Sequence, residues 1–503
     1  MASKRRNMFY ENKKQETMEI DDFREKKLTG NDIPGPRALP ILGTRWIYYG
    51  KYRLNKIHEA YKEMFEIYGP ILREEAVWNY PVINLIERED IEKVLRHMSR
   101  YPLRPPTDVT AHYRKSRPDR YTNMGIINEQ GEAWHKLRSL LTPELMSAKT
   151  MQRFLPELNN VADDFNILLL DSRDQDGVVK GFDQLSCRMG LESTCTLILG
   201  RRMGFLEKEI GSTASKLAEA VKDQFCASRD TFYGLPFWKI FPTPAYKKFM
   251  KSEDTIYDII SDLVEESLKE ETDTCALEAV QSVFMAILQA PGLDIRDKKA
   301  GIIDFIAAGI KTLGNTLVFL FYLLAKNPRC QQKLYDEIIN LAPFGTPLTS
   351  QTLRGAHYLR ACMMEAFRVL PTAPCVARIL ETDMELSGYQ LKPGSIVICH
   401  TWLACLQEKN FSNAMEFEPE RWLVDDSKST NVQVENKSPF LVVPFGVGRR
   451  MCPGKRFVEL ELQVVLAQTV RQFEIEFNGE LGLEFEFLLA PESPVNFRFK
   501  DRI

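Results

Sequence analysis

The sequence predicts a mostly helical protein with small β-sheets at its edge. Long stretches with apolar residues at helical spacing fill the middle of the chain, and shorter alternating stretches lie near its two ends. No stretch between residues 34 and 503 has the composition of a linker. We therefore expect one large domain over residues 34–503, preceded by a polar segment over residues 1–33.

The elements follow in order along the chain. The prolines of Ile33-Pro34-Gly35-Pro36 and the turn up to Gly43 exclude a helix at the start of the domain. Residues 70–87 alternate around Asn79-Tyr80-Pro81 and predict a β-hairpin. Helices are predicted at 128–147, 150–170, 206–227, 250–270, 296–326, 328–341 and 353–369, and strands at 374–400 and 472–501.

Composition and the N-terminal segment restrict the class of protein. The net charge of −3 argues against nucleic-acid binding, and ten cysteines without paired spacing predict reduced thiols rather than a disulfide framework. Residues 1–33 contain no apolar run near the roughly 18 residues that a membrane-spanning helix needs. The basic start from Met1 to Asn7 is typical of a mitochondrial import sequence, but acidic residues follow from Glu11 onward. A cleavable presequence and a disordered start both remain open.

One cysteine lies in a loop built of glycines and arginines, Phe445 to Gly454, directly before an amphipathic helix that begins near Lys455. Loop N–H groups, a helix N-terminus and nearby cations all stabilise a thiolate. The spacing Phe-x-x-Gly-x-Arg-x-Cys-x-Gly resembles the haem-binding loop of the cytochrome P450 family. The resemblance implies a triangular helical body that encloses haem b, with the Cys452 thiolate as the axial iron ligand and Phe445 packed against the haem. A buried structural cysteine is the alternative.

Four further residues fit the two propionates of such a haem. Trp134 and Arg138 are spaced i,i+4, so both side chains are expected on one helix face. Arg378 follows the turn Pro371 to Pro374, and Arg450 lies two residues before the cysteine. Arginine suits a carboxylate because its planar guanidinium binds both oxygens. The alternative is one packing aromatic residue and three surface arginines.

A pair of charged residues, Glu365 and Arg368, is spaced i,i+3 in a predicted helix and would ordinarily be an exposed salt bridge. The P450 family has this Glu-x-x-Arg pair buried and joined by an arginine from a Pro-Glu-Arg-Trp segment. Here that arginine is Arg421. The resemblance implies a structural network that fixes the cysteine loop.

The predicted helix 296–326 is expected to be interrupted at residues 307–312, the region that lies beside the iron in the resembled family. Ala308 and Gly309 are expected to leave room for O2, and Thr312 to relay protons during oxygen activation. An ordinary helical threonine that bonds back to a carbonyl is the alternative for Thr312.

The same region departs from the family at Lys311, where an aspartate or glutamate is usual. A lysine does not accept protons in the same way unless burial lowers its pKa. Either Thr312 and water alone relay the protons, or another acid substitutes, and Asp304 lies two turns earlier.

Substrate contacts are implied for four segments, 107–127, 303–308, 373–377 and 487–491. Their isoleucine, valine, alanine, leucine and phenylalanine residues suit an enclosed apolar pocket for a rigid lipophilic molecule such as a sterol.

A more specific resemblance, to arthropod ecdysteroid hydroxylases of the mitochondrial P450 type, covers nearly everything after residue 34. It is carried by Tyr101–Thr107, Arg114–Tyr121, Leu199–Phe205, Asp294–Lys299 and Met384–Tyr389. It implies hydroxylation of ecdysone at carbon 20, at the matrix side of the inner mitochondrial membrane with peripheral membrane association. The endoplasmic reticulum is the alternative location. The alternatives in activity are another steroid or xenobiotic monooxygenase, an O2-independent isomerase, and a non-catalytic carrier.

The mitochondrial type also implies that electrons come from NADPH through a small acidic ferredoxin of the adrenodoxin kind. Lys455 and Arg456, with Arg449 and Arg450, surround the cysteine loop and are expected to receive it. A flavoprotein reductase, or a merely solvated basic face, is the alternative.

Overall fold

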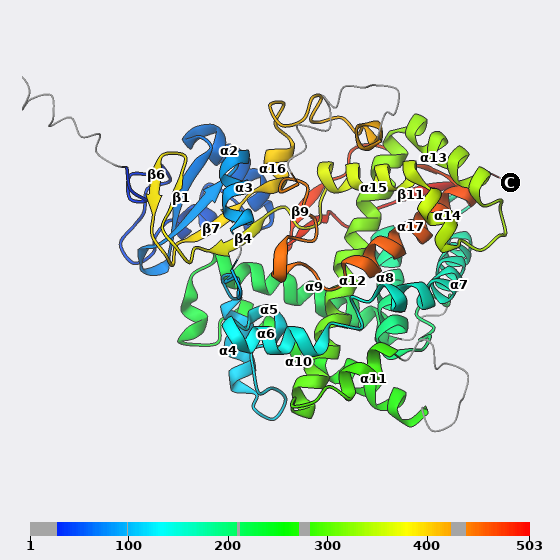
Figure 1. The fold of residues 1–503 in the computed structure, drawn as a ribbon, viewed down its shortest axis with the longest axis horizontal. Coiled ribbons are helices and arrows are strands. Elements are labelled where there is room, and N and C mark those ends of the chain that lie inside the picture. The colour runs from blue at the N-terminus through cyan, green and yellow to red at the C-terminus, as the bar shows by residue number, and fades with distance from the viewer. Residues whose placement is uncertain (1–27, 98, 209–211, 271–281, 424–438, 503) are drawn as a thin grey trace, which may run out of the picture.

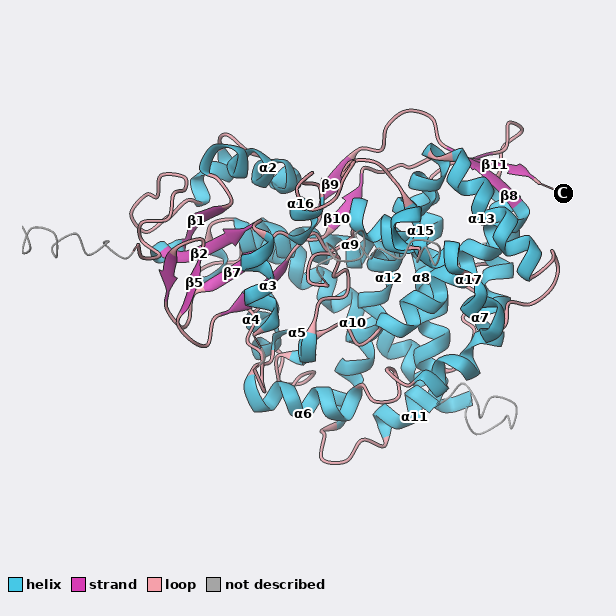
Figure 2. Ribbon diagram, turned by 45° about the horizontal axis from the view of Figure 1, so that its top comes forward, coloured by secondary structure: helices cyan, strands magenta, loops and turns pink. Residues whose placement is uncertain are grey.

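The computed structural model describes residues 28–97, 99–208, 212–270, 282–423 and 439–502. Residues 1–27, which make up most of the predicted polar segment, lie outside the described residues. Helices form most of the body and small sheets lie at its periphery (Figures 1 and 2). The predicted fold class is therefore confirmed.

The described helices have the following bounds: α2 Ile57–Tyr68, α3 Arg88–Arg96, α4 Asp108–Ser116, α5 Gly125–Asn128, α6 Gly131–Leu141, α7 Ala148–Ser172, α8 Phe182–Leu199, α9 Ser212–Tyr233, α10 Pro244–Glu270, α11 Ser282–Leu288, α12 Ile295–Lys326, α13 Pro328–Leu341, α14 Ser350–Gly355, α15 His357–Val369, α16 Thr401–Cys405 and α17 Lys455–Gln472. The strands are β1 Ile71–Ala76, β2 Tyr80–Leu85, β3 Val178–Val179, β4 Val376–Ile379, β5 Met384–Leu386, β6 Tyr389–Leu391, β7 Ile396–Cys399, β8 Phe473–Glu476, β9 Leu483–Phe485, β10 Leu489–Pro491 and β11 Phe497–Asp501.

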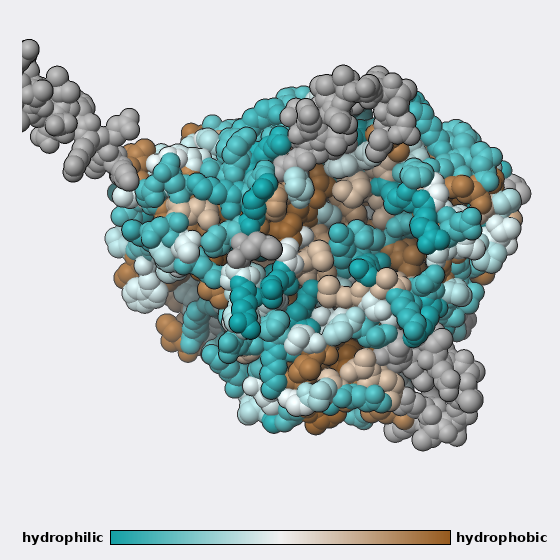
Figure 3. Space-filling model, viewed as in Figure 1, coloured by the Kyte–Doolittle hydropathy of each residue, from teal (hydrophilic) through white to brown (hydrophobic). Residues whose placement is uncertain are grey.

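The strands form four small sheets. The largest has the order β1-β2-β7-β4, in which β2 and β7 run parallel with Ile83 opposite Val397. The other sheets are β3-β11-β8 and the hairpins β9-β10 and β5-β6. Figure 2 shows the largest sheet on one side of the molecule and β8 with β11 on the other, near the C-terminus. Seen from the direction of Figure 1, hydrophilic residues cover most of the surface, with smaller hydrophobic groups between them (Figure 3).

Several predicted elements agree closely with the structure. The hairpin at 70–87 is β1 and β2, the helix at 328–341 is α13, and the helices at 150–170 and 296–326 are α7 and α12 with ends shifted by one or two residues. The helices predicted at 206–227 and 250–270 are α9 and α10 with shifted ends.

Two predicted helices are each divided. The stretch 128–147 contains only the end of α5 and then α6, because Glu129 is extended and Gly131 has a φ of +59°. The stretch 353–369 divides at Ala356 into α14 and α15. Helix α8 was not predicted as an element, because nearly all its residues from Ser186 to Leu199 are buried and no polar face marks a helical period.

Helix α12 runs through the middle of the helical body (Figure 1). Among the helices that the structure describes, it alone has the length and hydropathy of a membrane span, but 72% of that stretch is buried inside the protein. It is therefore a core helix, packed along α8.

The expected interruption of this helix at residues 307–312 is wrong, since α12 is an unbroken α-helix across them. Gly309 serves close packing instead. A Cβ at this position would overlap the Thr194 hydroxyl of α8 and would lie 2.9 Å from its methyl carbon.

Candidate active site

The cysteine loop is held in a fixed shape between α15 and α17. Gly446 and Gly448 have φ values of +69° and +68°, which other residues rarely adopt. The Cys452 N–H donates to the Phe445 carbonyl at 2.8 Å, which closes the loop. The Phe445 ring packs edge-on against Phe367 of α15, with the centroids 5.4 Å apart.

Opposing influences act on the Cys452 thiol. Burial raises its pKa, whereas the N–H groups of Gly454 and Lys455 at the start of α17, together with Arg138, act to lower it. The net effect favours the neutral thiol in the protein alone. Because a metal cation deprotonates a coordinating thiol, this donor set suits a thiolate bound to iron.

Four arginines gather beside the loop without acidic partners. Burial lowers the pKa of Arg450 to about 9, and repulsion from Arg104, Arg378 and Arg138 adds to this effect. Burial also lowers the pKa of each of the other three guanidinium groups. Among the described residues, no carboxylate forms an ion pair with any of the four, and Nη1 of Arg450 is buried without a hydrogen-bond partner.

Carbonyl groups from separate segments orient these arginines. Arg138 of α6 donates to Met451 at 2.8 Å, and Arg378 of β4 donates to Val447 at 3.2 Å. Arg450 donates to the Pro102 carbonyl at 2.9 Å and to the Glu129 carbonyl at 2.7 Å. The loop is thereby tied to α6, to β4 and to the segment around residue 102.

Trp134 packs against one of the four arginines. Its ring lies under the guanidinium of Arg450, with Cζ 4.0 Å from the ring centroid. Trp134 therefore positions Arg450, and a direct contact with a propionate remains a prediction.

The cluster fits the haem that the sequence implied. Partly buried guanidiniums without acidic partners favour a bound anion, and the two propionates of haem b carry two negative charges. Sequence reasoning missed Arg104, which lies in an irregular segment between Leu103 and Pro105. The sequence pattern that could have indicated Arg104 is a single cation within an otherwise apolar, proline-rich stretch.

The Glu365 network is fully buried, and the structure brings its three predicted members together. Glu365 and Arg368 are both 0% exposed and are joined by two hydrogen bonds, of 2.8 and 2.9 Å. Arg421 donates to Glu365 at 2.9 Å, and the indole of Trp422 donates to it at 2.8 Å. Arg368 also holds the carbonyls of Cys405, Ala414 and Glu416, so the network fixes the segment that leads to the cysteine loop.

The middle of α12 presents a small, accessible stretch. Ala308 is exposed although its neighbours Ala307 and Ile310 are buried, and Thr312 is half-buried. The Thr312 hydroxyl donates to the Ala308 carbonyl at 2.6 Å, which is the alternative considered for it. Its oxygen can still accept a hydrogen bond, so the proton-relay role remains a prediction.

Both charged residues near this stretch have partners. Asp304 accepts two hydrogen bonds from the Arg114 guanidinium of α4, one of them 3.1 Å long. The ammonium of Lys311 lies 3.2 Å from Glu486, in the turn between β9 and β10. Asp304 is thus engaged by Arg114.

The four predicted substrate segments meet at α12. Arg114 of the first segment contacts Asp304 of the second. Leu489 of the fourth accepts from Asn315 of α12 at 3.2 Å and donates to the Thr372 carbonyl, beside the third, at 2.9 Å.

The predicted docking residues lie at the surface, with one exception. Arg449 and Arg456 are exposed, and the Lys455 ammonium is 3.8 Å from Glu459 one turn along α17. Arg450 was expected among them, but it points inward to Pro102 and Glu129, so it belongs to the guanidinium cluster instead.

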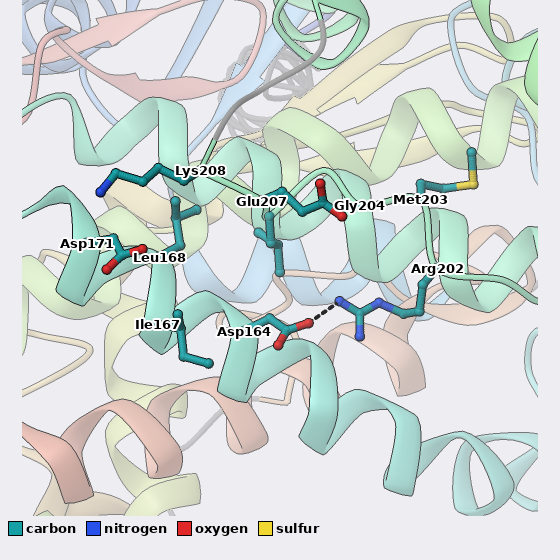
Figure 4. Close-up of a pocket in the computed structure, with 10 residues that line it drawn as sticks. Asp164, Ile167, Leu168, Asp171, Arg202, Met203, Gly204, Glu207 and Lys208 are labelled. Atoms are coloured by element: carbon teal, nitrogen blue, oxygen red, sulfur yellow. Dashed lines mark hydrogen bonds and ion pairs between the residues drawn. The ribbon is translucent and has the colours of Figure 1, made fainter.

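Two further cavities are lined by described residues, and the second includes the start of the substrate segment 107–127. One of about 580 Å³ lies between α7 and residues 202–208, where Arg202 reaches Asp164 at 2.7 Å (Figure 4). It contains no predicted site residue. The other, of about 300 Å³, is bounded by β1, the turn before β2, residues 105–109 and residues 231–239.

One buried carboxyl near the core has no assigned role. Glu461 of α17 accepts a hydrogen bond from the Ser193 hydroxyl at 2.7 Å, while its other oxygen has no partner. Burial raises its pKa to about 8. The group is therefore mainly protonated at neutral pH.

Comparison with known proteins gives a consistent result. The family model "Cytochrome P450" matches residues 33–498. The chain is 47% identical to the ecdysone 20-monooxygenase of Drosophila melanogaster, across 94% of this chain and 89% of the relative. It is 30% identical to cytochrome P450 302a1, mitochondrial, of the same species, across 92% and 94% of the two chains. The probable cytochrome P450 12a5, mitochondrial, is 31% identical across 93% and 90%.

Proposed function

Because the chain belongs to the cytochrome P450 family, we propose that it is a haem-thiolate monooxygenase that converts ecdysone to 20-hydroxyecdysone. The observation that supports ecdysone as the substrate is the identity of 47% to a relative named ecdysone 20-monooxygenase. Two mitochondrial relatives with other names are only 30% and 31% identical to the chain. The overall reaction consumes O2, two electrons and two protons, and yields the hydroxylated steroid and water.

When bound, haem b supplies the reductive activation of O2 and the insertion of one oxygen atom into a C–H bond. The protein provides the ligand and the counter-charges for it. Cys452 is the proposed iron ligand, and Phe445 would pack against the bound haem. The propionates are assigned to Arg104, Arg138, Arg378 and Arg450, with Trp134 supporting Arg450.

The residues of α12 prepare the oxygen side. The small side chain of Ala308, which is exposed on α12, leaves room for O2, whereas Gly309 faces Thr194 of α8. Thr312 holds a hydroxyl proton at Oγ1, which it can pass on while the same oxygen accepts another from water. The apolar residues of the four substrate segments exclude bulk water and hold the steroid.

An acidic ferredoxin of the adrenodoxin kind is the proposed electron donor, receiving electrons from NADPH through a reductase. The exposed cations Arg449, Lys455 and Arg456 lie next to the cysteine loop, which suits a partner of opposite charge. The names of two relatives include the word mitochondrial, which supports a mitochondrial location. Within the mitochondrion, the matrix side of the inner membrane is the proposed place.

Peripheral membrane association is proposed for the surface beside the 300 Å³ cavity. Trp78 is 77% exposed and Ile240 83% exposed, and Phe237 and Phe241 are also exposed. Apolar side chains gathered around a cavity mouth suit a lipid surface from which a steroid enters.

Ecdysone turnover with isotopically labelled O2 tests this function. The protein is reconstituted with a ferredoxin, its reductase and NADPH, and the product is identified by mass spectrometry. We expect 20-hydroxyecdysone carrying one labelled oxygen. Unlabelled product would exclude a monooxygenase, and turnover of other steroids without ecdysone would exclude the substrate.

Two pairs of variants, each with a matched control, test the proposed roles of Cys452 and Arg456. Cys452→Ala should abolish the red-shifted absorption band of the reduced, carbon monoxide-bound protein, whereas Cys330→Ala, a buried thiol of α13, should retain it. Arg456→Glu should raise the KM for ferredoxin without changing the Kd for ecdysone. Arg498→Glu, on β11, should change neither value.

A further inference from the structure

The lysine on the oxygen-side helix has a buried partner. Nζ of Lys311 lies 3.2 Å from Oε2 of Glu486, and the two side chains are only 12% and 3% exposed. Two charges this far from water are costly unless each neutralises the other. Lys311 therefore serves as a fixed counter-ion at a position where the resembled family usually has an acid.

Glu486 connects two helices from the tip of the β9–β10 hairpin. Its second oxygen, Oε1, lies 3.3 Å from Nζ of Lys222 on α9. Lys222 is also 3.8 Å from Glu484 on β9. One carboxylate thus bridges cations of α9 and α12, which both lie beside the hairpin (Figure 2).

Two further contacts hold the same tip. Arg229 of α9 donates to the Phe485 carbonyl at 2.8 Å. Phe487 has a φ of +80° and its ring packs edge-on against Phe232 of α9, with centroids 5.6 Å apart. A non-glycine residue keeps such a conformation only where its surroundings impose it.

The tip also touches the proposed pocket. Phe487 opens the substrate segment 487–491, and Leu489 in that segment bonds to Asn315 of α12 and to the Thr372 carbonyl. A displacement of the tip would therefore move a wall of the pocket relative to α9 and α12.

We propose that Glu486 is a positioning residue that clamps the hairpin tip between Lys311 and Lys222, and that this clamp places Phe487 and sets the affinity of the pocket for its steroid. The inference rests on the proposed function only for the identity of the steroid. It assigns Lys311 a structural use and leaves proton delivery to Thr312 and water.

A double-mutant cycle tests the clamp in the holoenzyme. Lys311→Met, Glu486→Gln and the double variant are compared by amide hydrogen exchange of residues 483–489 and by the Kd for ecdysone from the substrate-induced absorption shift. Each single variant should speed exchange at the tip and raise the Kd about tenfold. The double variant should be no worse than Glu486→Gln, because that single variant already removes the pair with Lys311 as well as the pair with Lys222.

Two controls accompany the cycle. Lys311→Arg keeps the charge and should retain most of the slow exchange. Glu492→Gln removes a Lys56–Glu492 pair of 2.5 Å at the base of the same hairpin, and should change neither exchange nor Kd. If one single variant fails to fold, the other carries the test, since each breaks the same contact.

Three results would overturn the clamp. Unchanged exchange at residues 483–489 in both single variants would do so, as would additive effects in the double variant. Increased peroxide release with unchanged Kd and exchange would assign Lys311 to proton delivery instead. The exchange measurement needs no substrate, so it still decides the clamp if the protein fails to bind ecdysone.

Discussion

Glu365→Gln is expected to lower the free energy of unfolding by about 4 kcal/mol. Oε1 of Glu365 accepts from the guanidinium groups of Arg368 and Arg421 and from the backbone N–H of Glu418. A glutamine carbonyl can keep those contacts. Oε2 accepts from Arg368 Nε and from the Trp422 indole, and a glutamine NH2 group would face both donors. Each buried donor left without an acceptor costs about 1–3 kcal/mol.

Two such losses give about 2–6 kcal/mol, which agrees with the roughly 3–5 kcal/mol found when a buried ion pair loses one member. Since domains are stable by about 5–15 kcal/mol, the variant should lose a large share of its stability. Urea unfolding followed by circular dichroism measures the difference. Glu480→Gln is the matched control, because that carboxylate is 79% exposed and pairs with Lys326 at the surface.

The control should lose only a small part of that stability, because exposed ion pairs contribute little. If Glu365→Gln were as mild as the control, the network would not be the rigid support of the cysteine loop that the geometry indicates.

Three other variants are informative. Arg104→Leu should speed haem release about tenfold yet leave the apoprotein as stable as before or more so, because it removes a partly buried cation without an acidic partner. Haem transfer to apomyoglobin and urea unfolding of the apoprotein measure the two effects, and haem release at the original rate would contradict the prediction. Glu461→Gln should gain stability relative to the original protein as pH rises. The pKa of Glu461 is raised from the ordinary 4.5 to about 8 in the folded protein, so between these pH values only the folded state holds the proton. The stability that this proton gives the original protein is fully present below pH 4.5 and is lost as pH rises to 8. Between pH 5 and pH 8, the difference in unfolding free energy between the two proteins, measured by urea unfolding, should change by up to about 1.4 kcal/mol per pH unit. A difference that stays constant with pH would refute this prediction. Gly309→Ala should cost about 1–3 kcal/mol through overlap with Thr194, whereas Gly50→Ala, where the nearest atom is 4.0 Å away, should cost under about 1 kcal/mol by thermal unfolding.

Periodicity predicted α7, α12 and α13 closely, but it missed the short amphipathic helices α2 and α3 as well as the buried α8. Helix α13 has a polar and an apolar face, so its bounds were readable from the sequence. Helix α8 is buried on nearly every side and shows no such contrast. The break at Ala356 between α14 and α15 follows Gly355, a weaker stop signal than proline, and the predicted helix 353–369 passed over it.

The candidate site divides in the same way. Cys452 and its loop were found because the chemistry lies within ten consecutive residues. Arg104 and Glu486 were missed because their significance depends on partners far away in the chain, such as Arg450 and Lys311. Their roles follow from three-dimensional proximity and the absence or presence of an opposite charge.

The guanidinium cluster implies an order of assembly. Until a dianion arrives, four cations repel one another beside the segment that supplies the axial ligand, so this region gains its full stability last. Polyphosphates and other multivalent anions should therefore stabilise the folded apoprotein by binding in the same positive potential. Raised ionic strength should weaken their binding. The cofactor then acts as the counter-ion that completes maturation, as well as the reagent for turnover.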